Sequence, residues 1–104
     1  MTEVIVSTVF QPAPGARELL IAALRDGIPA IQSEDGCMLY AIHDAEDSTI
    51  VALEKWASHE DLDAHAAGEA LHRLDALVAP HLERPVTWTT MTAIPAGTDR
   101  QGLL

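Results

Sequence analysis

Hydrophobic positions follow two periodicities along this chain, and each periodicity predicts a type of element. Residues 3–10 are rich in β-branched side chains and end at a proline-rich turn, which predicts a strand. From residue 16 onward, apolar residues recur at spacings of three and four, which predicts a helix with one buried face. Pro29 lacks a backbone donor, so we expect this helix to kink or to end early near Gly27, with Gly36 as the stop signal.

The second half of the chain continues with a hairpin, two helical segments and a last strand. Residues 37–43 and 49–56 are extended runs, and the short acidic segment between them favours an antiparallel turn. Ser58 is followed three residues later by an aspartate, which is the spacing of a helix-capping box. Gly68 then bends the chain before another apolar helical stripe, and Pro85 begins the last extended run.

This order of elements predicts the fold class. Strand, helix, strand, strand, helix pair and strand suit an α+β fold of the ferredoxin-like, split βαβ type. We expect a four-stranded antiparallel sheet with helices on one face. A chain of 104 residues is long enough for one core, so we assign residues 1–95 to a single domain and 96–104 to a flexible C-terminal tail.

The second strand of the hairpin is apolar on both faces. Ile50, Ala52 and Trp56 point to one face. Val51 and Leu53 point to the other. The helices can cover only one of these faces, so we expect a second copy of the chain to cover the other, in a homodimer. The alternative is a monomer whose second sheet face is somewhat apolar at the surface.

Composition and charge exclude several classes of partner. There are 16 acidic and 6 basic residues, and the formal net charge of -10 would repel a phosphate backbone or an anionic membrane surface. No apolar stretch approaches the roughly 18 residues of a membrane span, and residues 1–10 do not resemble a signal segment. We therefore expect a cytoplasmic protein with no nucleic-acid or membrane partner. The single cysteine, Cys37, rules out an internal disulfide and a cysteine-based metal cage.

Three histidines lie near one another in the sequence, and their spacing argues against a metal site. Seven helical residues separate His65 from His72 and advance about 10 Å along a helix, whereas two nitrogens on one zinc each lie about 2.1 Å from it. A break at Gly68 is an arrangement that could bring these two together. We predict no bound metal.

A more informative group is Glu54, Trp56 and His65. Glu54 and Trp56 share a strand face, and a helix that begins at Ser58 would aim His65 back toward them. A carboxylate beside an imidazole is a reasonable general-base arrangement, and an aromatic wall suits a flat ligand. The alternative is structural: Glu54 pairs with an arginine, Trp56 belongs to the core and His65 packs.

Three segments of the chain together resemble a known family. Residues 34–40 read EDGCMLY, residues 54–56 read EKW and residues 61–65 read DLDAH. In order and separation they are similar to the E-x-G-C-x-x-Y segment, the E-x-W strand end and the histidine-bearing helix of the antibiotic biosynthesis monooxygenase family. The resemblance covers residues 3–95. It implies a dimeric α+β barrel with a ferredoxin-like subunit.

The resemblance also implies an activity. Well-understood members oxidise quinols or polycyclic aromatic polyketides with molecular oxygen, without metal, flavin or heme. By this resemblance His65, oriented by Glu54, takes a proton from a small quinol-like or phenolic substrate, and Trp56 and Tyr40 pack against its ring. No cofactor is expected.

The chain also departs from the family pattern. Residues 65–71 are mostly small, so the substrate of a relative cannot be assigned to this chain. The heme-degrading branch has an iron-binding histidine where this chain has Asp75 and a first-strand asparagine where it has Ser7 or Thr8, which makes heme degradation a poorer expectation. A non-catalytic, small-ligand-binding dimer of the same fold is the alternative, and a scaffold whose pocket is filled by side chains is a third.

Overall fold

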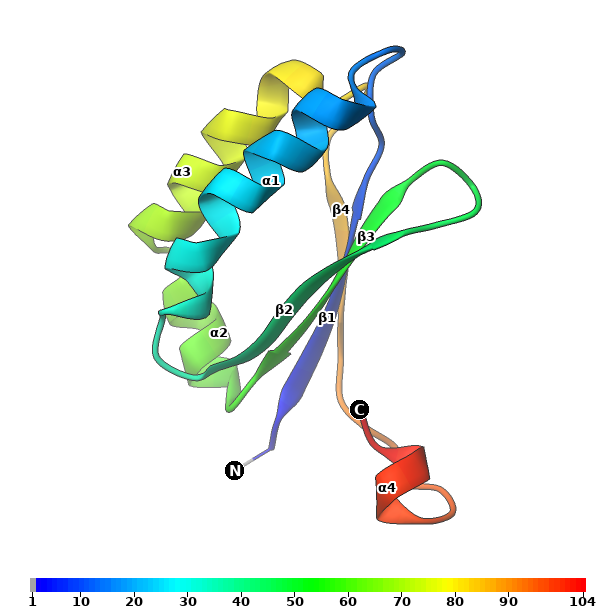
Figure 1. Ribbon diagram of the computed structural model, residues 1–104. Coiled ribbons are helices and arrows are strands. Elements are labelled where there is room, and N and C mark those ends of the chain that lie inside the picture. Colours follow the sequence, from blue (N-terminus) through cyan, green and yellow to red (C-terminus); the bar gives the residue numbers. More distant parts are fainter. Residues whose placement is uncertain (1) are drawn as a thin grey trace.

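The chain forms strands and helices in the expected order, and the computed structural model describes residues 2–104. The elements are β1 (Val4–Phe10), α1 (Arg17–Gln32), β2 (Cys37–Asp44), β3 (Ile50–Trp56), α2 (His59–Ala66), α3 (Glu69–Val78), the 3-10 turn η1 (Ala79–His81), β4 (Thr87–Met91) and α4 (Asp99–Gly102). All strand pairs are antiparallel, in the sheet order β2-β3-β1-β4. Helices α1 and α3 lie side by side against one face (Figure 1). The predicted α+β class and split βαβ topology are confirmed.

The sheet face beneath the helices supplies the core and the floor of the site. Along β1 and β3, buried and half-buried residues alternate strictly, as in strands with one face packed. The register pairs Val6 with Glu54 and Thr8 with Ala52, so these four side chains share the inner face. Trp56 ends this row and is fully buried. The face assignment predicted for this strand is therefore confirmed.

Helix α1 corrects one expectation from the sequence. It continues through Pro29 to Gln32, so the early end expected near Gly27 is wrong. Pro29 has no N–H to donate to the carbonyl four residues earlier in the helix. Because Pro29 is on the exposed side, water can donate a hydrogen bond to that carbonyl instead. The neighbouring Ile28 and Ile31 are buried in the core, and their burial stabilises the last turn of the helix.

Helix α2 begins where the capping pattern predicts. The Ser58 side-chain oxygen accepts a hydrogen bond from the Asp61 backbone N–H at 3.1 Å, and the Ser58 hydroxyl donates to an Asp61 carboxylate oxygen at 3.0 Å. The helix is short and carries one buried side chain, that of His65. Gly68 separates α2 from α3, as the sequence indicates.

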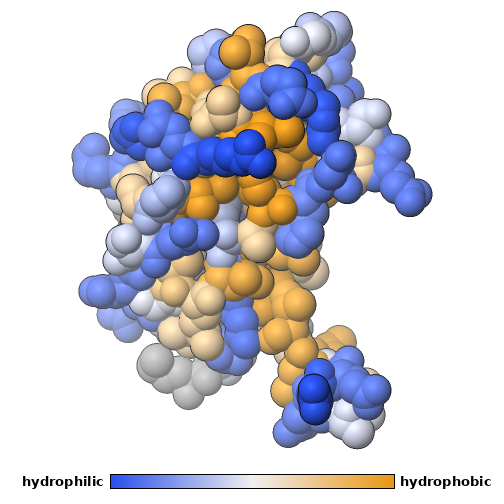
Figure 2. All heavy atoms as spheres, in the orientation of Figure 1, coloured by the Kyte–Doolittle hydropathy of each residue, from blue (hydrophilic) through white to orange (hydrophobic). Residues whose placement is uncertain are grey.

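The other face of the sheet has no helical cover from α1, α2 or α3, which all lie on the opposite side (Figure 1). Half-buried apolar side chains occupy this outer face on the two central strands: Ile5, Val9, Val51 and Leu53. In the space-filling view, hydrophobic residues fill the seam between helices and sheet and continue along the sheet toward the C-terminal segment (Figure 2). The edge strand β4 is exposed along its length.

The segment after residue 95, expected to be a loose tail, contains the one-turn helix α4. Lys55, on the outer face, contacts both ends of the described chain. Its ammonium group lies 3.5 Å from the Glu3 carboxylate and 2.8 Å from the Leu104 backbone oxygen. Within residues 2–104, no helix is long and apolar enough to cross a bilayer.

Candidate functional site

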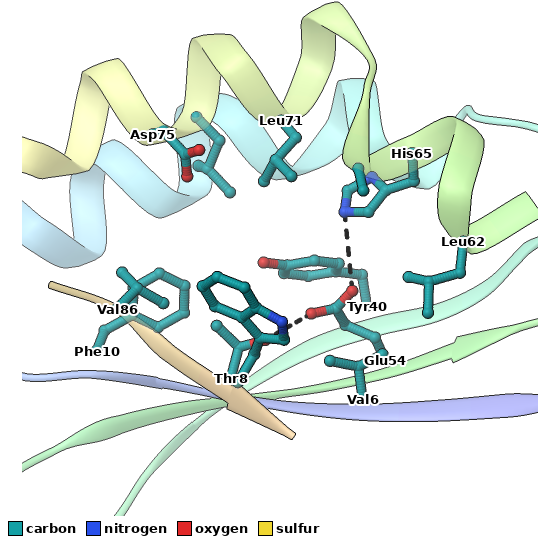
Figure 3. A pocket seen from close by; sticks show the side chains of 13 residues that line it. Val6, Thr8, Phe10, Tyr40, Glu54, Leu62, His65, Leu71, Asp75 and Val86 are labelled. Carbon is teal, nitrogen blue, oxygen red and sulfur yellow. Dashed lines mark hydrogen bonds and ion pairs between the residues drawn. The ribbon is translucent and has the colours of Figure 1, made fainter. Parts of the chain in front are cut away.

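A cavity of about 320 Å³ lies between the inner face of the sheet and helices α2 and α3 (Figure 3). Most of its wall is apolar, and the polar groups come from five residues: Thr8, Tyr40, Glu54, His65 and Asp75. The remaining lining side chains are Val6, Phe10, Leu62, Ala66, Leu71, Leu74, Val86 and Trp88. A mostly apolar cavity with a few convergent polar groups is typical of a small-molecule site.

His65 is held by a carboxylate that comes from the other side of the fold. Its Nδ1 lies 2.7 Å from Oε1 of Glu34, in the turn between α1 and β2. A carboxylate only accepts hydrogen bonds, so Nδ1 carries the proton and donates it. In the neutral imidazole the lone pair is then on Nε2, which faces the cavity (Figure 3).

Glu54 lies on the Nε2 side of the same imidazole, with its Oε1 at 3.9 Å from Nε2. Two donors fix its carboxylate. The Thr8 hydroxyl donates to Oε2 at 2.7 Å, and the Trp56 indole N–H donates to Oε1 at 3.1 Å. Glu54 is only 4% exposed, so its orientation is set by these bonds rather than by solvent.

The indole of Trp56 packs against the imidazole of His65. The two rings are stacked, with centroids 4.4 Å apart and planes inclined by 30°. Trp56 is not among the side chains that line the cavity. Its indole touches the imidazole and Glu54, whereas the aromatic side chains that line the cavity are Phe10, Tyr40 and Trp88.

Tyr40 is a cavity-lining aromatic residue on β2, an edge strand of the sheet. It pairs with Glu54 across β2 and β3 and is 4% exposed. Burial raises the pKa of the Tyr40 phenol well above its usual range, and the nearby carboxylates of Glu54 and Asp75 add to the shift. Tyr40 is therefore a neutral hydrogen-bond donor at physiological pH.

The structure brings His65, Glu54 and Tyr40 to one cavity and places Trp56 directly behind His65. Sequence reasoning missed Glu34 as the Nδ1 partner, although this residue opens the E-x-G-C segment. It also missed Thr8, whose signal was a polar residue on the buried face of a strand. Trp88 was missed as a lining aromatic residue.

The arrangement can perform proton transfer. Nε2 is an acceptor inside the cavity, and an imidazolium formed there would lie between two carboxylates, those of Glu34 and Glu54. His72, the other histidine of the metal hypothesis, is exposed on α3. Within residues 2–104, no three His, Cys, Asp or Glu side chains are grouped to hold a metal ion.

Comparison with known proteins gives consistent results. Residues 3–76 match the family model described as antibiotic biosynthesis monooxygenase. The chain is 33% identical over 92 residues to the "putative monooxygenase Rv0793" of Mycobacterium tuberculosis, and the match covers 88% of this chain and 91% of that protein. The solved structure of Rv0793 has a TM-score of 0.82 at 31% identity, over 93% of this chain and 100% of that one. PA3566 from Pseudomonas aeruginosa, at 22% identity, shares the fold with a TM-score of 0.78 over 90% of this chain and 96% of its own.

Proposed function

This chain belongs to the antibiotic biosynthesis monooxygenase family, and from that premise we propose that it oxidises a quinol-like or phenolic, including polycyclic, aromatic substrate with molecular oxygen. The observation that carries the proposal is the imidazole of His65. Its Nδ1 is bound to Glu34 and its Nε2 opens into a largely apolar cavity. We further propose that the reaction needs no metal, flavin or heme.

The substrate itself supplies the electrons in this reaction. For a quinol, one oxygen atom of O₂ forms a new C–O bond on the ring and the other leaves as water, so that a quinol and O₂ give a hydroxyquinone and H₂O. The O–O bond breaks, the ring loses four electrons and O₂ accepts four. No external reductant is required.

In the proposed mechanism, Nε2 of His65 takes the proton of the phenolic hydroxyl, which leaves an electron-rich phenolate to react with O₂. The imidazolium formed is stabilised by Glu34 at 2.7 Å, by Glu54 at 3.9 Å and by the stacked face of Trp56. The same imidazolium can return the proton to the departing water. Tyr40 lines the wall beside the ring, and the apolar lining keeps water from the reactive intermediate.

Oxygen consumption tests the proposal directly. Quinols and hydroxylated polycyclic compounds are screened with an oxygen electrode, with chelator present, and His65→Ala is measured on the substrate found. We expect turnover to fall about 10²-fold or more, with the free energy of unfolding changed by less than roughly 2 kcal/mol. His72→Ala is the control, because His72 is exposed and does not line the cavity.

Glu34→Gln is the second variant, because an amide at this position no longer requires the proton to be on Nδ1. We expect a turnover loss of about 10- to 100-fold. Near-normal turnover in His65→Ala would remove His65 from the mechanism. Binding of the aromatic compounds without any oxygen uptake would instead favour the non-catalytic, ligand-binding alternative.

A further inference from the structure

The polar groups of the cavity are distributed over two ends. His65 and Glu54 lie at one end with Leu62, and Asp75 descends from α3 at the other end, near Phe10 and Val86 (Figure 3). The proton-transfer mechanism uses only the first end. The carboxylate at the second end has no role in it.

Asp75 has apolar neighbours along the cavity wall. Its neighbours along α3, Leu71 and Leu74, line the same cavity, and so does Trp88 of β4. Burial raises the pKa of the Asp75 carboxyl, although His72 and His65 act in the opposite direction. Asp75 is exposed to solvent, so it lies at the rim of the cavity.

Within residues 2–104, the carboxylate of Asp75 has no hydrogen-bond or ion-pair partner, whereas two other aspartates are paired with arginines. Asp26 pairs with Arg73 at 3.1 Å and Asp44 pairs with Arg17 at 2.6 Å. Because Asp75 is exposed at the rim and has no fixed partner in the protein, its carboxylate oxygens are available to accept a hydrogen bond from a group inside the cavity. A donor on a bound ligand would supply the missing partner.

The charges of the cavity also favour a ligand with a hydrogen-bond donor. Over the described part of the chain, no lysine or arginine lines it, while Glu54 and Asp75 do. Glu34 adds a third carboxylate immediately behind His65. An anionic group on a ligand would meet carboxylates and no fixed cation, whereas a hydroxyl or ammonium group would find acceptors.

We propose that Asp75 determines substrate specificity by accepting a hydrogen bond from a hydroxyl or ammonium group at the end of the substrate away from His65. This inference rests on the proposed function and narrows its substrate class. The site takes flat aromatic compounds with a proton donor at each end, neutral or cationic. It rejects compounds with a carboxylate at the Asp75 end.

Binding measured without oxygen separates this inference from catalysis. Three probes are titrated calorimetrically under anaerobic conditions: a naphthalene para-diol, its aminomethyl derivative and its carboxylate derivative. We expect the aminomethyl compound to bind most tightly and the carboxylate compound most weakly. In Asp75→Asn, the affinity ratio of the aminomethyl to the carboxylate compound should fall about tenfold or more.

Asp63→Asn is the matched control, because it also removes one negative charge but from an exposed position on α2 that does not line the cavity. It should leave the ratio unchanged. An unchanged ratio in Asp75→Asn, an equal fall in Asp63→Asn, or no binding of any probe overturns the inference. If the affinity ratio falls as expected but no probe consumes oxygen, the inference about Asp75 holds and the monooxygenase proposal fails. If a probe consumes oxygen but the affinity ratio is unchanged, the monooxygenase proposal holds and the inference about Asp75 fails.

Discussion

At the scale of single residues, the surroundings of His65 determine which of its ring nitrogens donates a hydrogen bond and which faces the cavity. Glu34 binds Nδ1 at 2.7 Å, and Glu54 is held in place by Thr8 and Trp56. The imidazole therefore lies between two carboxylates, with one ring nitrogen toward each.

Tyr40 gives a prediction about alkaline stability. Burial raises the folded-state pKa of the phenol above the ordinary value of about 10, so the unfolded chain loses this proton first as the pH rises. The contribution of Tyr40 to the free energy of unfolding is fully present below about pH 10. Above that pH it is lost, by at most about 1.4 kcal/mol per pH unit. Tyr40→Phe removes this component, so urea unfolding of the variant should show a shallower alkaline decline than the wild type. Parallel declines would contradict the assignment, and because Tyr40 is the only tyrosine, tyrosinate absorbance gives an independent reading.

Part of this site could be predicted from sequence and part could not, for a physical reason. Glu54 and Trp56 follow from strict alternation along one strand, and the approach of His65 follows from the helix that begins at Ser58. These are local rules. Glu34 lies 31 residues from His65, and their contact depends on the path of a turn, which periodicity does not encode.

At the scale of elements, the turn between α1 and β2 positions Glu34 beneath α2. Gly36 in this turn has φ +77°, and its carbonyl accepts a hydrogen bond from the Ala57 N–H at 2.8 Å. A Cβ at Gly36 would collide with the Asp61 side chain, including its Cβ at 2.6 Å. Asp61 is the residue whose backbone N–H bonds the helix-capping serine, so the turn and the start of α2 are packed against each other.

Gly36→Ala should therefore destabilise the protein for two reasons, backbone strain and overlap with Asp61. Gly15→Ala is a matched control, because Gly15 has φ +76° but open space around it. We expect Gly15→Ala to cost about 1 kcal/mol and Gly36→Ala to cost at least about 1 kcal/mol more in chemical denaturation. Equal losses of unfolding free energy in the two variants would show that the Asp61 side chain moves away from the new Cβ without an energetic cost.

The helix before this turn shows where sequence reasoning about elements fails. A proline inside a helix costs about 3 kcal/mol, which favours a break. Here the proline is on the exposed side, and Ile28 and Ile31 on the other side are buried. Local helix propensity contains no information about which side chains are buried in the folded protein. That burial nevertheless determines where this helix ends.

At the scale of the whole molecule, the outer face of the sheet is the main surface without a structural explanation in a single chain. Its central strands present Ile5, Val9, Val51 and Leu53, and Met91 on β4 lies beside Ile5. The alternation that predicted the inner face predicted this face as well. We propose that a second copy of the chain covers it, by burial of apolar surface.

Light scattering after size-exclusion chromatography at micromolar concentration tests this proposal, with twice the chain mass expected. Leu53→Glu places a charge at the centre of the face and should give a monomer. Leu19→Glu, at a position on α1 that is 57% exposed, should leave the mass unchanged. A wild-type monomer over the whole concentration range would exclude the dimer.

The stacked pair behind the cavity also gives the molecule an internal optical reporter. A protonated imidazole is an electron acceptor that quenches the excited state of an indole in contact with it, and Trp56 lies 4.4 Å from His65, centroid to centroid. The chain has two tryptophans, so Trp88→Phe would leave Trp56 as the sole emitter. Its fluorescence lifetime would then follow the charge on His65 in real time, before any substrate is known and during each proton transfer once one is found.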